Sequence, residues 1–140
     1  FGKVEYNGRG DIETYNDRKA AGFIGRYNTT AEAMFHYYVK PQATGNRTDV
    51  RWVSISDTRN RLMVAAKSPF QFSVTPFSDS VIDRATHINQ LSRDGLLTVH
   101  LDANQSGVGT ATCGPGVAEK YRVSVKPTSF EFVLYPAMAK

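Results

Sequence analysis

Cysteine and histidine are scarce in this sequence, and their scarcity excludes several kinds of site. Cys113 is the only cysteine among 140 residues, so no disulfide can form within the chain. One cysteine also cannot build a zinc site that rests on several cysteines. The three histidines occur at none of the spacings that metal-binding motifs use. We therefore expect no metal ion or other cofactor in this chain.

Long apolar runs and concentrated positive charge are also missing. The longest apolar runs, residues 62–66 and 132–139, are the length of a strand, whereas a membrane-spanning helix needs about 18 residues. The net charge is +4, but the lysines and arginines are scattered along the sequence. Phosphate-binding proteins instead concentrate such residues on one groove or helix. We expect a soluble chain with neither a membrane nor a nucleic acid as its partner.

Apolar and polar residues alternate along much of the chain, which is typical of strands with one face on a core. The alternation predicts strands over residues 50–56, 62–66, 70–75, 97–102, 121–126 and 130–134, with weaker candidates at 4–6 and 21–27. A tight turn over residues 57–60 would join two of them. Two short helices are predicted, over residues 30–38 after a Thr30 cap and over residues 79–84 after a Ser78 cap. Together these elements predict an all-β fold, an antiparallel β-sandwich.

One long loop separates two of the predicted strands. Residues 104–116, which we call the late loop, contain four glycines and one proline. The late loop is too long for a hairpin turn, and long ordered loops tend to carry function. Cys113 lies in it and has three interpretations: a buried thiol that packs the loop, a residue that lines a binding site, or a reactive thiolate. No histidine or lysine adjoins Cys113 in the sequence to stabilise a thiolate.

Four segments carry longer motifs. Residues 6–18 read YNGRGDIETYNDR, residues 38–52 read YVKPQATGNRTDVRW, residues 83–87 read DRATH, and the late loop reads GVG followed by CGP. In this order, and over nearly the whole chain, they resemble the C-terminal domain of the β-galactosidases of glycoside hydrolase family 2. Asp11 stands where that family has a proline.

The resemblance implies a fold for this chain and places catalysis on a different domain of the enzyme. Residues 1–140 would form a single domain or fragment, the C-terminal part of a β-supersandwich (domain 5, or small chain) related to galactose mutarotases. The complete enzyme would hydrolyse terminal non-reducing β-D-galactose with two glutamates on a separate barrel, and the family commonly uses magnesium and sodium on domains other than this one. We therefore expect no catalytic residue here and no activity of this chain alone. The family's late loop carries an aromatic platform for the sugar, so Cys113 and its neighbour Thr112 are the predicted substrate-binding residues.

The resemblance also implies partners. They are a β-galactoside, held in the parent active site, and the rest of the parent enzyme. Part of a supersandwich leaves strand edges uncovered, so we expect self-association or an oligomer. The bacterial cytoplasm and the periplasm both remain open as compartments, because one cysteine suits either.

Two other functions compete with this interpretation. A free-standing carbohydrate-binding β-sandwich would need an exposed aromatic strip, but the aromatic residues mostly occupy inward positions, and we expect Trp52 in the core. A mutarotase-like epimerase would use a histidine and a glutamate around an open sugar cleft. Its candidates are His87 or His100 with Glu119, although nothing in their spacing favours the pair.

Overall fold

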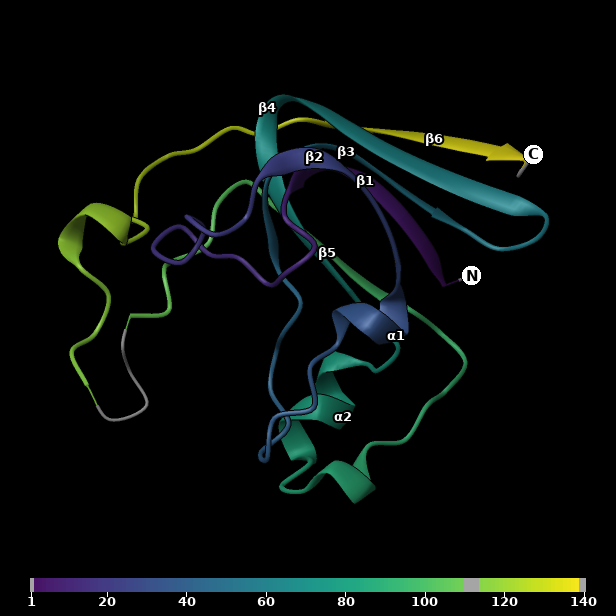
Figure 1. The fold of residues 1–140 in the computed structure, drawn as a ribbon, viewed down its shortest axis with the longest axis horizontal. Coiled ribbons are helices and arrows are strands. Elements are labelled where there is room, and N and C mark those ends of the chain that lie inside the picture. Colours follow the sequence, from purple (N-terminus) through teal and green to yellow (C-terminus); the bar gives the residue numbers. More distant parts are fainter. Residues whose placement is uncertain (1, 110–113, 139–140) are drawn as a thin grey trace.

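The computed structural model describes residues 2–109 and 114–138 (Figure 1). Thr112 and Cys113 therefore lie outside the described residues. The elements are β1 (Lys3–Arg9), β2 (Ile24–Thr30), α1 (Ala31–Met34), β3 (Arg47–Ser56), β4 (Asn60–Thr75), α2 (Asp79–Arg84), η1 (Ile88–Gln90), β5 (Thr98–Asp102), η2 (Glu119–Tyr121) and β6 (Phe132–Met138).

The strands form one antiparallel sheet, in agreement with the predicted all-β fold. Their order is β2-β1-β3-β4-β5, and β6 also pairs with β4. In Figure 1 the helical segments α1 and α2 lie together below the sheet, and the segment from residue 114 to β6 extends to the left of it. The expected turn at residues 57–60 is present, because Asp57 N donates to Asn60 O at 3.0 Å.

β4 is the central strand of this sheet, and it joins two strands that the sequence predicted separately. Its first half pairs with β6 from Asn60 to Ala66, and its second half pairs with β5 from Gln71 to Thr75. Residues 67–69 between the halves are exposed. These three residues interrupt the alternation of apolar and polar residues from which the strands were predicted. The chain nevertheless continues as one strand, because β3 pairs with both halves.

The core lies on one face of the sheet. The side chains of Val4, Tyr6, Val53, Phe72 and Val74 alternate inward and are at most 1% exposed. Each such apolar side chain contributes roughly 1.5–3 kcal/mol by leaving water. A smaller cluster joins Phe35, directly after α1, with Phe77 and with Ile82 of α2.

α2 has the predicted bounds, whereas α1 is shorter than predicted. α1 ends at Met34 rather than at residue 38, because Phe35 adopts an extended backbone and the N–H of His36 donates to Thr44 Oγ1 at 2.8 Å. Thr30 does cap α1 through its side chain. Ser78 precedes α2 as expected but makes no side-chain capping bond.

Two further expectations are wrong. Residues 121–126 form no strand: η2 ends at Tyr121, and Val125 is fully exposed. The alternating segment pairs with no strand of the described sheet, and the edge of β4 from Asn60 to Ala66 is taken by β6. Trp52 is half-buried rather than in the core, and Arg26 lies 5.7 Å above its ring.

Candidate functional site

The described arms of the late loop meet at its base. A Cβ atom added to Gly109 would lie 2.9 Å from the carbonyl carbon of Gly116 and 3.0 Å from the carbonyl oxygen of Pro115. Gly109 also has a φ of +65°, which favours glycine. The two predicted binding residues, Thr112 and Cys113, lie outside the described residues, between these arms. We call residues 107–109 and 114–117 the loop base.

A carboxylate from the other end of the chain holds the loop base. Asp17 Oδ1 accepts from Val108 N at 3.0 Å, and Asp17 Oδ2 accepts from Gly109 N at 2.8 Å. Gly107 is buried directly against this carboxylate, since a Cβ there would lie 2.3 Å from Asp17 Cγ. Hydrogen bonds to an ionised acceptor are stronger than neutral ones. Asp17 therefore fixes the path of the chain as it enters the late loop.

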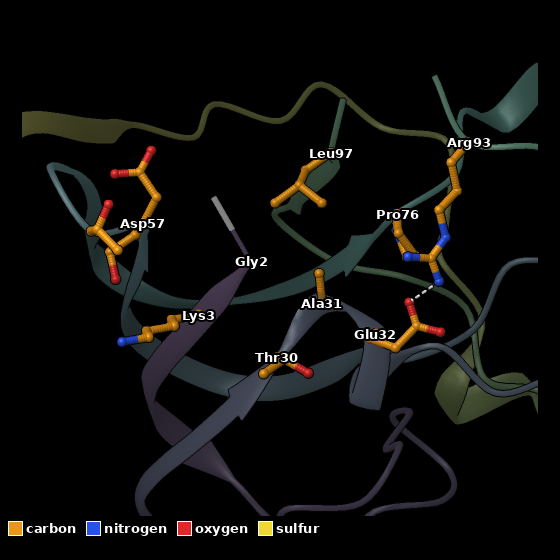
Figure 2. Close-up of a pocket in the computed structure, with 11 residues that line it drawn as sticks. Gly2, Lys3, Thr30, Ala31, Glu32, Asp57, Pro76, Arg93 and Leu97 are labelled. Carbon is orange, nitrogen blue, oxygen red and sulfur yellow. Dashed lines mark hydrogen bonds and ion pairs between the residues drawn. The ribbon is translucent and has the colours of Figure 1, made fainter. Parts of the chain in front are cut away.

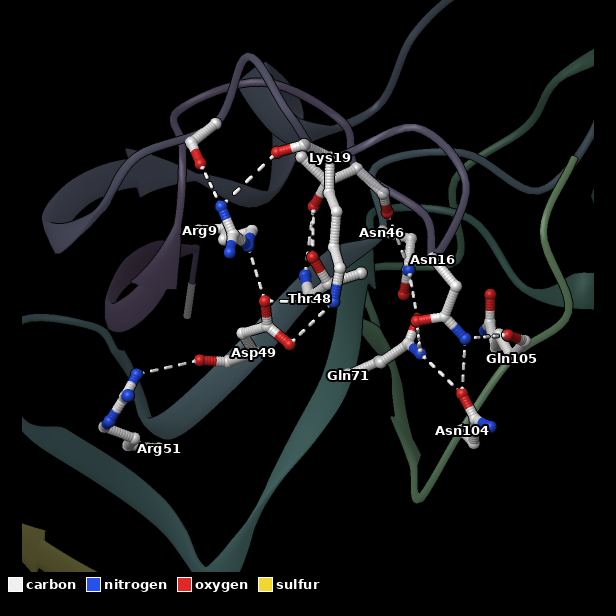
Figure 3. A network of polar contacts seen from close by, with 12 residues as sticks. Arg9, Asn16, Lys19, Asn46, Thr48, Asp49, Arg51, Gln71, Asn104 and Gln105 are labelled. Atoms are coloured by element: carbon white, nitrogen blue, oxygen red, sulfur yellow. Dashed lines mark hydrogen bonds and ion pairs between the residues drawn. The ribbon is translucent and has the colours of Figure 1, made fainter. Parts of the chain in front are cut away.

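A network of side-chain amides extends this contact into the sheet (Figure 3). Asn16 Nδ2 donates to Asn104 Oδ1 at 2.6 Å and to Gln105 O at 2.8 Å. Gln71 Nε2, on β4, donates to Asn104 Oδ1 at 3.1 Å. Asn46 Nδ2 in turn donates to Gln71 Oε1 at 2.8 Å. The start of the late loop is thus joined through Gln71 to the most buried half of β4.

The segment that carries Asp17 is anchored by a second aspartate (Figure 3). Asp49 accepts from Arg9 Nε and, at 3.0 and 3.1 Å, from Lys19 Nζ. Arg9 also donates to Gly22 O at 2.8 Å, so the loop between β1 and β2 is held at both ends. Burial alone would raise the pKa of Asp49, but the hydrogen bonds from Arg9 and Lys19 outweigh it and lower the pKa. Asp49 also has a φ of +54°, which is uncommon for a residue other than glycine.

A buried arginine holds the same loop from inside. Arg47 is 3% exposed and pairs with carbonyl and hydroxyl oxygens rather than with a carboxylate. It donates to Tyr6 Oη, Gly45 O and Asp11 O at 3.0 Å each, and to Asn46 O at 3.3 Å. Tyr6 Oη donates onward to the carbonyl of Gly10. These contacts join β1, β3 and the loop after β1, which positions Asp17.

Glu13 completes the contacts between the first two motif segments. Its carboxylate accepts from Tyr15 Oη at 2.6 Å, Tyr38 Oη at 3.1 Å and Gly45 N at 3.2 Å. Burial, together with the hydrogen bond to Glu13, raises the pKa of Tyr15 far above its usual value. Residues 6–18, residues 38–52 and the late loop therefore converge in space. The fourth motif, residues 83–87, meets the second segment at another place, where Asp83 and residues 40–43 line one pocket.

Comparison with known proteins identifies the protein family in which these motifs occur. Residues 1–134 match the family described as beta galactosidase small chain. The chain belongs to this β-galactosidase small-chain family. Its relatives include the β-galactosidases of Staphylococcus xylosus (30% identical, covering 96% of this chain and 14% of that protein) and Kluyveromyces lactis (33%, 96% and 13%). Another is β-galactosidase BgaC of Bifidobacterium adolescentis (36%, 78% and 11%). The chain thus spans only 11–14% of these relatives' lengths.

The residues proposed for an epimerase are not brought together in this β-galactosidase small-chain domain. Glu119 pairs with Arg122 at 3.0 Å. His87 Nδ1 lies 3.0 Å from Thr86 Oγ1. His100 lies between Ser73 Oγ, at 3.1 Å from its Nδ1, and Asp79 Oδ2, at 3.0 Å from its Nε2. Each side chain therefore has a different partner.

The exposed aromatic side chains do not line up as a carbohydrate-binding module would require. Phe23, Tyr37 and Tyr135 are 78%, 40% and 52% exposed, but they come from the β1–β2 loop, the segment after α1, and β6. Across residues 2–109 and 114–138, no three His, Cys, Asp or Glu side chains group as metal ligands would. No helix in this part of the chain is long and apolar enough to cross a membrane.

A pocket of about 460 Å³ lies away from the late loop (Figure 2). Ala31 and Leu97 line it, and the ion pair of Glu32 with Arg93 lies at one side. Figure 2 shows Lys3 on the opposite side from that pair. None of its lining residues belongs to the loop base.

Sequence reasoning found the late loop but missed the residues that hold it. Asp17, Asn16 and Gln71 were not singled out, although the first two lie in the motif of residues 6–18. The sequence did contain a signal for this contact. The motif carries an aspartate, and a glycine-rich loop exposes backbone N–H groups that can donate to a carboxylate. Gln71 gave no signal, because its position in an alternating strand predicts a solvent-facing residue, whereas it is 4% exposed.

Proposed function

We propose that this chain is a non-catalytic part of a β-galactosidase, and that it supplies scaffold and one edge of the galactose site. Membership of the small-chain family supports this, as do relatives that are named β-galactosidases and are far longer. The proposed parent reaction is the retaining hydrolysis of terminal non-reducing β-D-galactose, by two glutamates outside this sequence. Residues 1–140 would form the C-terminal part of the parent's supersandwich.

The observation that carries the proposal is the construction of the loop base. Asp17 holds Val108 and Gly109, and Asn16 holds the start of the loop, so its entry is fixed before the residues that would meet a sugar. A loop whose entry is already fixed loses less conformational entropy when a ligand arrives. In the proposed enzyme, Thr112 and Cys113 present a small, weakly polar edge to the sugar and take no part in bond cleavage.

The carboxylates around the loop base favour a structural role. Asp17 is occupied by two backbone N–H groups, Glu13 by two tyrosines and an N–H group, and Asp49 by Arg9 and Lys19. A general acid or a nucleophile must be free to reach the glycosidic bond. Groups engaged in this way support the proposal that this chain alone is inactive.

Turnover of a nitrophenyl β-galactoside tests whether hydrolysis requires the rest of the polypeptide. The 140-residue chain, purified from a host without its own β-galactosidase, should give no more product than buffer. The full-length polypeptide that carries this sequence should be active. Turnover by the isolated chain would contradict the proposal, and so would an inactive full-length polypeptide.

Cys113→Ala in the full-length polypeptide tests the role of the loop. The KM should rise about fivefold or less while kcat is kept, because the thiol contributes contact rather than chemistry. Thr128→Ala, an equally small change in the exposed segment before β6, is the matched control and should leave both constants unchanged. A large loss of kcat at unchanged KM would instead make Cys113 a chemical participant.

A further inference from the structure

The sheet face opposite the core carries a small polar pocket. Its volume is about 230 Å³, and its lining includes Lys3, Glu5, Asn28, Ser54, Ser56 and Arg61. The strand register places these side chains in two rows. Lys3 pairs with Ser56, which pairs with Arg61, so these three share one row across β1, β3 and β4. In the next row Glu5 lies between Asn28 of β2 and Ser54 of β3.

Arg61 is incompletely paired in this pocket. Its Nε is buried and has no hydrogen-bond acceptor among the residues that the structure describes. Four other arginines of the described residues form ion pairs with carboxylates, namely Arg9, Arg26, Arg93 and Arg122. A buried charged donor without an acceptor is unfavourable, and native proteins rarely leave one. Arg61 thus lines the pocket with a guanidinium whose Nε lacks an acceptor in the described part of the chain.

The rest of the lining is also rich in unused donors. Within residues 2–109 and 114–138, Lys3 forms no ion pair, and the hydroxyls of Ser54 and Ser56 make no hydrogen bond. Of the described residues, Glu5 is the one acidic group that lines the pocket, and Arg26 pairs with its carboxylate. The positive charges of Lys3 and Arg61 are therefore not neutralised locally.

We propose that this pocket binds an oxyanion, with Arg61 and Lys3 supplying the charge and Ser54 and Ser56 supplying hydroxyl donors. Carboxylate, phosphate and sulfate share the required chemistry, because each presents several acceptor oxygens to a guanidinium. The oxyanion has two possible sources. It is either a free anion from solution or an Asp or Glu side chain from the remainder of a longer polypeptide.

Thermal unfolding in phosphate tests the first source. The full-length polypeptide is titrated with inorganic phosphate at constant ionic strength, so that general screening does not change. The Tm should rise with phosphate, and the apparent phosphate affinity should fall at least about tenfold in Arg61→Gln. Arg59→Gln is the matched control: it removes the same charge from an exposed residue of the adjacent turn and should keep the wild-type response. Should Arg61→Gln fail to fold, Lys3→Gln, at an exposed strand end, should weaken the response in its place.

A crystal structure of the full-length polypeptide soaked in selenate distinguishes the sources. An anomalous peak beside Arg61 Nε, together with an Arg61-dependent phosphate response, supports a free anion. A protein carboxylate within hydrogen-bond distance of Arg61 Nε supports the second source. The proposal is overturned if neither occupies the pocket. It is also overturned if selenate binds while phosphate stabilises Arg61→Gln as much as wild type, which would show an adventitious ion only.

Discussion

Asp17 and Gly107 are in such close contact that a Cβ atom on Gly107 would lie 2.3 Å from both Cγ and Oδ2 of Asp17. The missing side chain lets the carboxylate approach the backbone and accept the N–H groups of Val108 and Gly109. These bonds join positions 91 and 92 residues apart, so they tie the beginning of the domain to the late loop. Asp17 and Gly107 therefore act as one structural unit.

Gly107→Ala should consequently have the same effect as removing the Asp17 carboxylate. The new methyl group displaces the carboxylate from both N–H groups, and we expect a loss of about 1–3 kcal/mol in the free energy of unfolding. Asp17→Ala should cost a similar amount, and the double variant little more than either, because all three lose the same contact. Urea unfolding measures the stabilities, and hydrogen exchange at Val108 and Gly109 should accelerate in each variant.

Gly116→Ala is the matched control for this cycle. Gly116 belongs to the same loop base, but a Cβ there would meet nothing within 4 Å. It should change stability by no more than about 0.5 kcal/mol. Additive losses for Asp17→Ala and Gly107→Ala would show that the two residues do not share one interaction.

Arg47→Lys should destabilise the domain although the charge is kept. An ammonium group cannot reach Tyr6 Oη, Gly45 O and Asp11 O together, as the guanidinium does at 3.0 Å each. We expect a loss of about 2 kcal/mol or more, because buried oxygens lose their donors. Urea unfolding measures it. Arg51→Lys, on an exposed side chain with one bond to Asp49 O, should change stability by about 0.5 kcal/mol or less, and equal losses would contradict the assignment.

Asp57 should contribute to acid sensitivity. Hydrogen bonds from the N–H groups of Asn60 and then Arg59 lower the pKa of Asp57 from its usual 3.8 to about 2. Because the folded-state pKa is the lower one, this stabilisation is present above pH 3.8 and is lost as the pH falls through about 2. In Asp57→Asn the Tm should therefore fall less steeply over that interval. Thermal unfolding between pH 6 and 2 measures it, and parallel curves for the two proteins would contradict it.

Self-association of the isolated chain should run through β6. This strand pairs with β4, and its side chains Val133, Leu134 and Tyr135 are 40–53% exposed. Val133→Lys should weaken dimerisation at least about tenfold in sedimentation equilibrium, because an edge lysine opposes strand pairing. Val125→Lys makes the same change at a fully exposed position outside the strands and should have no effect. A monomeric wild-type chain at high concentration would contradict self-association.

The local pattern of the sequence was sufficient for elements whose partners lie nearby. Alternation located the strands that became β3, β4 and β5, and the Asp57–Asn60 turn followed from residues suited to turns. Thr30 as the cap of α1 was likewise predictable, because a threonine side chain reaches an N–H group three residues on. The four motif segments identified the family without a structure, since their order survives in the linear sequence.

Contacts between distant residues decided the rest. Residues 121–126 alternate as well as β5 does, but a strand exists only where another strand offers its backbone groups. In the described sheet that partner is present for β5, which pairs with β4, and not for residues 121–126. α1 ends at Met34 because the N–H of His36 donates to the side chain of Thr44 instead of to a helical carbonyl. The helical spacing of apolar residues does not predict this contact. The sequence by itself determined the fold class, the family and the late loop, because these depend on local periodicity and on motif order. Tertiary structure alone decided that Asp17 holds Gly109 and that Arg61 Nε lies buried without an acceptor among the described residues, because both follow from packing between strands and loops rather than from local pattern.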